Sequence, residues 1–146
     1  MKRQTVEVDA PRDLVFEVVA GAGKKVREIN QGKVVEFETQ WRDRSIKTVE
    51  ELRLDPPREI RYRWLEGPLQ NVVEKIVFDS KGASSTKMTY TGTFESDRGI
   101  AGWVRSFVFV RPAFDRLVRE HLDEGKRIAE TRAKRSHVHP RASQDI

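Results

Sequence analysis

Two glutamates occupy positions of the sequence where an apolar residue would be expected. Glu50 and Glu74 each lie in a segment that alternates between apolar and polar residues, and each falls on the apolar side of that alternation. A buried carboxylate is costly, so it must take up a proton or find hydrogen-bond partners. Burial also raises a carboxyl pKa towards the range that suits a general acid or base. The alternative is that each glutamate extends to a rim or pairs with an arginine, and the sequence leaves both interpretations open.

Aromatic residues are expected beside these two carboxyl groups. Short turns separate the alternating segments, and matching the faces across them places Glu50 near Tyr62 or Trp64. The same reasoning places Glu74 near Tyr62 across one turn and near Tyr90 across the next. The sequence therefore predicts a polar row of glutamates and tyrosines on an otherwise apolar face, with a tryptophan beside it.

His121 is the third titratable candidate. It lies in "RPAFDRLVREHLDEGKRI", where Phe114, Leu117 and Ile128 continue the apolar stripe of a long helix, so its ring is expected to face the same interior. A lone histidine on an apolar helix face is either a satisfied core residue or a functional one. A metal site is not expected, because the chain has no cysteine, only three histidines and no ligand-spacing motif.

The elements that must position these residues follow from the periodicity. "QTVEVDA" predicts a first strand and "PRDLVFEVVAG" a short helix that begins after Pro11. "AGKKVREIN" is polar and is interpreted as one further helical turn at most. Five alternating segments follow, which predict an antiparallel meander, and residues 102–135 predict a long helix that Pro112 should kink or restart. The five segments are "GKVVEFETQW", "SIKTVEELRL", "REIRYRWLE", "LQNVVEKIVFD" and "STKMTYTGTFE".

This order of elements resembles the START/polyketide-cyclase (SRPBCC, Bet v 1-like) superfamily, in its branch of polyketide-cyclase-like and ubiquinone-binding proteins. "VDAPRDLVFEVV" is similar to the superfamily's opening, and "LEGPLQNVVEKIVFDSKGASSTKMTYTGTFE" is similar to its Gly-Pro hairpin and closing strands. The resemblance implies an α+β helix-grip fold, a curved antiparallel sheet of six to seven strands wrapped around a long C-terminal helix. It assigns residues 1–135 to one domain and 136–146 to a flexible tail.

Composition and charge limit the other classes of function. Six basic residues against two acidic ones between 126 and 146 supply most of the net charge of +5, so the excess lies in a helix end and tail and no nucleic-acid partner is expected. No apolar stretch approaches a membrane span or a signal peptide, which predicts a soluble, cytoplasmic protein. A phosphate loop and a dinucleotide fingerprint are both missing from the sequence, so no cofactor is expected.

Three functions stay open. The first is binding or transport of a hydrophobic small molecule, such as a lipid, quinone or polyketide-like aromatic, in the cavity that the resemblance implies between sheet and helix. The second is a cyclase or dehydratase that uses Glu74 or His121 as general base, with Tyr62 as a further catalytic candidate. The third is an interaction module that meets a ribosome or membrane surface through its basic C-terminal segment. The predicted ligand-binding residues are Phe37, Trp41, Glu50, Tyr62, Trp64, Glu74, Phe78, Tyr90, Phe94, Phe114 and His121.

Overall fold

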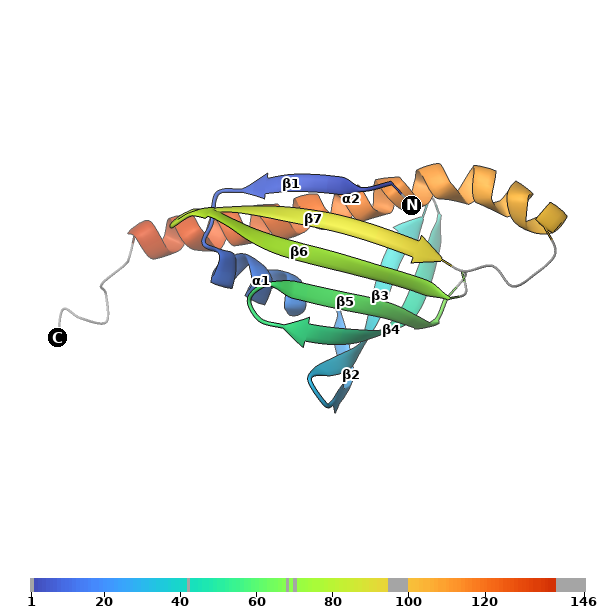
Figure 1. The fold of residues 1–146 in the computed structure, drawn as a ribbon, viewed down its shortest axis with the longest axis horizontal. Helices are drawn as coiled ribbons and strands as arrows, with labels where there is room; N and C mark the ends of the chain where they lie inside the picture. The colour runs from blue at the N-terminus through green and yellow to red at the C-terminus, as the bar shows by residue number, and fades with distance from the viewer. Residues whose placement is uncertain (1, 42, 68, 70, 95–99, 139–146) are drawn as a thin grey trace.

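A computed structural model describes residues 2–41, 43–67, 69, 71–94 and 100–138. It contains one curved antiparallel sheet, a short helix and a long C-terminal helix (Figure 1). The sequence prediction of an α+β helix-grip fold is confirmed. The elements are β1 (Gln4–Val8), α1 (Arg12–Ala20), β2 (Lys24–Ile29), β3 (Gly32–Trp41), β4 (Arg44–Asp55), β5 (Glu59–Glu66), β6 (Val72–Gly82), β7 (Ser85–Phe94) and α2 (Ile100–Val138).

The sheet has seven strands in the order β1-β7-β6-β5-β4-β3-β2. Each consecutive pair from β2 to β7 is an antiparallel neighbour, because the turns that join these strands are short. The connection through α1 carries the chain from β1 to β2 at the opposite edge of the sheet. The following strands then bring β7, the last strand, beside β1. Six of the seven strands are those that the alternation predicts.

β2 is the strand that the periodicity missed. The sequence is ambiguous here and predicts one further helical turn at most, and this prediction is wrong, because Lys24–Ile29 is a strand. Five of its six residues are exposed, so it carries no apolar face from which a period could be read. It becomes a strand because its backbone pairs with β3, with an irregularity in register between Lys25 and Arg27.

The two faces of the sheet differ as the alternation predicts. On β4, β5, β6 and β7 the even-numbered residues are largely buried, including Leu52, Ile60, Phe78 and Met88, each at most 1% exposed. Arginines and lysines of the opposite parity lie on the outer face, where they pair with glutamates such as Glu51. The face that carries these even-numbered residues, which we call the inner face, therefore points to the protein interior.

α2 packs against α1 and β1. The buried line on α2 runs through Phe114, Val118, Leu122 and Ala129. Gly125 lies in the same line, and a Cβ atom built there would meet the Val19 side chain of α1 at 3.4 Å. The two helices can therefore approach closely at this point.

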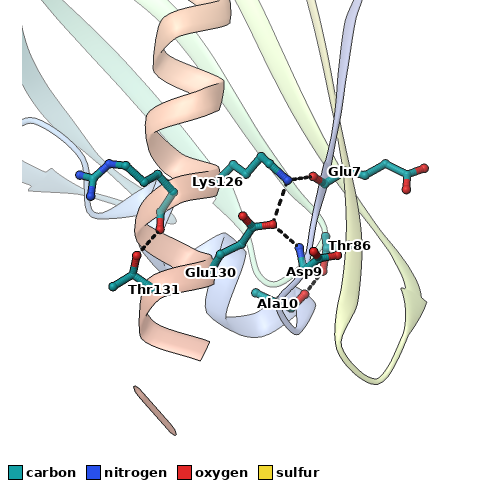
Figure 2. A network of polar contacts seen from close by, with 8 residues as sticks. Glu7, Asp9, Ala10, Thr86, Lys126, Glu130 and Thr131 are labelled. Carbon is teal, nitrogen blue, oxygen red and sulfur yellow. Dashed lines mark hydrogen bonds and ion pairs between the residues drawn. The ribbon is translucent and has the colours of Figure 1, made fainter. Parts of the chain in front are cut away.

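Polar contacts also attach α2 to β1 and to the residues that follow it (Figure 2). The Nζ atom of Lys126 donates hydrogen bonds to the Glu7 carbonyl oxygen at 2.7 Å and to the Glu130 Oε2 atom at 2.8 Å. The same Glu130 oxygen accepts a hydrogen bond from the Asp9 backbone N–H at 2.8 Å. We call Lys126, Glu130 and their contacts to Glu7 and Asp9 the β1 clip. It fixes the C-terminal half of α2 along the first strand.

α2 is longer than the periodicity predicts at both ends, and it continues through Pro112. Its C-terminal bound, Val138, lies three residues beyond the expected domain boundary at 135, and residues 139–146 of the expected tail lie outside the described part of the chain. No helix in the described part of the chain is long and apolar enough to cross a membrane.

Candidate functional site

The strand register brings Glu50 and Glu74 together on the inner face of the sheet. Glu50 of β4 lies opposite Trp64 of β5, and Tyr62 of β5 lies opposite Glu74 of β6. Both glutamates are buried, with 7% and 8% of their surfaces exposed. The sheet thus places two carboxyl groups side by side among aromatic residues, in the register that the alternation predicts. We call Glu50 and Glu74 the carboxyl pair.

Three side chains donate hydrogen bonds to the carboxyl pair. The Trp64 Nε1–H donates to Glu74 Oε1 at 2.6 Å, and the Tyr90 hydroxyl donates to Glu74 Oε2. The Thr48 hydroxyl donates to Glu50 Oε2 at 2.7 Å. Each glutamate therefore has the hydrogen-bond partners that a buried carboxyl group needs.

The pKa of each carboxyl group is raised. Burial raises the pKa of Glu50, the negative charge of Glu74 raises it further, and hydrogen bonds from Thr48 and Trp64 act in the opposite direction; the result is about 8. Burial also raises the pKa of Glu74, against the hydrogen bonds from Tyr90 and Trp64. The two carboxyl groups also interact with each other by charge and by hydrogen bonding. Two such neighbours do not both ionise readily, and the raised pKa of Glu50 keeps that carboxyl group mostly protonated at neutral pH.

Tyr62 lies beside the carboxyl pair without a hydrogen-bond partner in the described part of the chain. Its side chain is only 9% exposed, and burial and then the charges of Glu50 and Glu74 raise its pKa. Among the described residues its hydroxyl makes no hydrogen bond. No fully buried side-chain nitrogen or oxygen in the described part lacks a partner, so this hydroxyl must still be reachable by water or by a ligand.

Aromatic contacts connect the site to α2. The rings of Trp64 and Phe114 lie 5.7 Å apart between centroids at an angle of 46°. Phe114 is buried on α2, so the same tryptophan that donates to Glu74 also packs against the long helix. Six predicted site residues thus form one connected group: Glu50, Tyr62, Trp64, Glu74, Tyr90 and Phe114.

Other predicted residues lie elsewhere. Phe78 packs edge-on against Phe16 of α1, with centroids 5.3 Å apart, and so belongs to the core below that helix. Phe37 is half-buried, and a Cβ atom at Gly23 would lie 2.8 Å from its ring. The side chains of Trp41 and Phe94 lie outside the described residues.

His121 does not reach the carboxyl pair. Its side chain is exposed on the flank of α2, and among the described residues it makes no hydrogen bond or ion pair. Partial loss of hydration beside the neighbouring protein lowers the pKa of its imidazole, and the charge of Glu120 acts in the opposite direction. The expectation that its ring faces the tyrosines and glutamates therefore differs from the arrangement observed.

One residue of the site was not singled out from the sequence. Thr48 lies two positions before Glu50 on the same strand, so period-2 alternation puts its hydroxyl on the same face. That spacing was a signal available in the sequence.

Among the described residues no group of three or more histidine, cysteine, aspartate or glutamate side chains is arranged to hold a metal ion.

Comparison with solved structures shows the fold. The chain is similar to the aromatase/cyclase Zhui from Streptomyces sp. R1128, with a TM-score of 0.70, 21% identity, and 92% of this chain and 93% of that one covered. It is equally similar to the di-domain aromatase/cyclase StfQ from the steffimycin biosynthetic pathway, with a TM-score of 0.70, 20% identity and 92% of this chain covered. The chain has the helix-grip fold of these aromatase/cyclases.

The same fold covers a START superfamily protein from Mycobacterium smegmatis, with a TM-score of 0.59, 14% identity, and 92% of this chain and 97% of that one covered. The chain spans about half the length of StfQ, 47% of it. No protein-family model matches the sequence, and a search of curated proteins finds none that is similar.

Proposed function

We propose that the protein binds a hydrophobic small molecule between the inner face of the sheet and α2. The observation that carries the proposal is the hydroxyl of Tyr62, a residue that is nine-tenths buried; this hydroxyl has no hydrogen-bond partner among the described residues and is not fully enclosed. Ligand sites are typically apolar and aromatic surfaces with a few oriented polar groups, which is the composition found here. The similarity to aromatase/cyclases and to a START protein supports the same class of function.

Binding would come mainly from burial of apolar surface against Trp64 and Phe114, at about 25 cal/mol for each Å² removed from water. The polar end of the ligand would meet Tyr62 and the carboxyl pair. Because Trp64 and Tyr90 already hold Glu74 in place, the polar end of this site is preorganised, which lowers the entropic cost of binding.

A fluorescence titration with the apolar probe N-phenyl-1-naphthylamine tests the proposal. We expect saturable binding with a Kd on the order of micromolar. Tyr62→Phe, which removes one hydroxyl without orphaning a described partner, should change the affinity several-fold. The matched control is Arg63→Ala, the next residue of β5 on the outer face, which should leave binding unchanged. Absence of saturable binding, or equal effects of the two variants, would contradict the proposal.

Acid–base catalysis by a cyclase or dehydratase is the second candidate, and the pKa of Glu50 of about 8 favours it. A carboxyl group that is protonated near pH 7 can donate to a carbonyl oxygen and take the proton back later. If the protein cyclises a poly-β-carbonyl substrate in this way, Glu50→Gln and Glu74→Gln should each lower kcat at least a hundredfold. His121→Ala separates the two bases expected from the sequence, since loss of turnover in that variant alone would assign the base to the histidine.

A further inference from the structure

The carboxyl pair has no cationic partner among the described residues. Ten ion pairs are found in that part of the chain, and neither Glu50 nor Glu74 takes part in any of them. Lys33 of the adjacent strand β3 interacts with Glu28 and Lys25 and not with the carboxyl pair. A buried negative charge without a cation is costly, so either a proton or a cation bound from outside must neutralise it.

The hydrogen bonds around the pair favour a negative charge on it. The Trp64 Nε1–H can only donate, and it points at a Glu74 oxygen, as does the Tyr90 hydroxyl. Thr48 does the same at Glu50. Three donors directed at carboxyl oxygens stabilise an ionised carboxyl group more than a protonated one, which opposes the effect of burial.

The groups nearest to this charge are aromatic. Trp64, Tyr62 and Tyr90 lie on the same face of the sheet as the carboxyl pair, and Phe114 contacts Trp64 from α2. Aromatic rings can bind organic cations, and the apolar part of a ligand can pack against them. The Tyr62 hydroxyl adds an accessible oxygen that can accept a hydrogen bond from a ligand.

We propose that the carboxyl pair binds the ammonium group of an amine whose remaining body is apolar. The ammonium would donate hydrogen bonds to the carboxylate oxygens and to the Tyr62 hydroxyl oxygen, while its body packs on Trp64 and Phe114. The positive charge of the ammonium group favours the ionised form of the carboxyl pair, so a proton displaced from the pair on binding leaves to solvent. This inference rests on the proposed function, because it names the ligand class of the same site.

Titration calorimetry with three probes of one shape tests the inference: 2-(1-naphthyl)ethylamine, 2-(1-naphthyl)ethanol and 1-naphthylacetic acid. At pH 7 we expect the amine to bind at least about tenfold more tightly than the alcohol, and the acid to bind most weakly. Repeating the amine titration in buffers of different ionisation enthalpy should show release of up to one proton per amine bound.

Variants make the assignment specific to the pair. Glu50→Gln with Glu74→Gln in one chain should remove the preference for the amine while the alcohol still binds, which also shows that the variant is folded. Glu130→Gln, a carboxyl group of the β1 clip, should keep the preference in full. Equal affinities for amine and alcohol in the unaltered protein would overturn the inference and leave the proposed function intact. Failure of all three probes to bind would overturn both.

Discussion

Glu74 of the carboxyl pair and Glu130 of the β1 clip are the same residue type in opposite electrostatic settings. Burial acts on both in the same direction, raising the pKa. At Glu130 the hydrogen bonds from Lys126 and from the Asp9 backbone N–H, with the charges of Lys126 and Lys134, outweigh that effect, so its pKa is lowered. At Glu74 the hydrogen bonds from neutral donors do not outweigh burial, so its pKa is raised. Glu130 is both less buried and paired with a cation, and Glu74 is buried with neutral donors alone, so burial and the missing cation together raise the pKa of Glu74.

The difference also separates holding the fold together from preparing a site. The β1 clip lies between α2 and β1, where its charges are satisfied by the chain itself (Figure 2). The carboxyl pair lies on the inner face of the sheet, where only neutral side chains of the described residues donate to it. Ionisable groups whose pKa is strongly shifted by burial and by neighbouring charges are typical of functional sites.

The largest expected effect is on the pH dependence of stability. The ordinary pKa of a glutamate is 4.5, and that of folded Glu50 is about 8. Between these values the folded protein holds a proton that the unfolded chain has released, so the free energy of unfolding falls as pH rises, by up to about 1.4 kcal/mol per pH unit. The contribution of Glu50 to the free energy of unfolding is fully present below pH 4.5 and fully lost above about pH 8. Urea unfolding at pH 5, 6, 7, 8 and 9 measures it.

Glu50→Gln should flatten this dependence and make the protein more stable than the unaltered chain at pH 9. Glu130→Gln is the control and should keep the slope, because the pKa of that carboxyl group is lowered. An unchanged slope in Glu50→Gln would show that the carboxyl pair does not set the pH dependence.

Glu74→Leu should have the next largest effect. The substitution removes the Glu74 acceptors of the partly buried Trp64 N–H and of the Tyr90 hydroxyl, and loss of a hydrogen bond to a buried group costs about 1–3 kcal/mol. Unfolding at pH 5, where Glu50 is protonated in the folded protein, reduces the contribution of charge to this loss. Glu74→Gln keeps an acceptor oxygen and should lose less. Equal stability of the Leu variant and the unaltered protein would contradict the hydrogen-bond arrangement.

Glu130→Gln should have a smaller effect on stability. The Lys126–Glu130 pair is partly exposed, and such pairs contribute about 0.2–1 kcal/mol. The glutamine oxygen can still accept from the Asp9 N–H, so only the ionic part is lost. Thermal melts in low salt and in 1 M salt should show a difference that shrinks at high salt, because salt screens an exposed pair. A difference that persists in high salt would indicate a packing defect instead.

Removing residues 136–146 should have the smallest effect. Lys134, Arg135 and Ser136 are exposed at the end of α2, so the cut falls in a segment without buried contacts. The melting temperature should change by no more than a few degrees. A larger loss would show that the C-terminal segment packs on the domain.

The sequence by itself determined the inner face of the sheet and the register of the carboxyl pair. Short turns join β4, β5 and β6, and successive residues of a strand point to opposite faces, so Glu50, Tyr62 and Glu74 could be placed on one face by counting. The long helix followed from its apolar stripe for the same local reason. Both are properties of one element or of neighbours joined by a tight turn.

Only the tertiary structure decided the rest. β2 has no apolar period, and its backbone pairing with β3 alone makes it a strand. His121 lies on the flank of α2 because the buried line of that helix runs through Val118 and Leu122, an orientation set by docking against α1 and β1. Phe78 and Trp64 share the inner face, yet one packs on α1 and the other on α2. Periodicity gives the face on which a side chain lies, but the partner that covers that face comes from contacts between elements far apart in the chain.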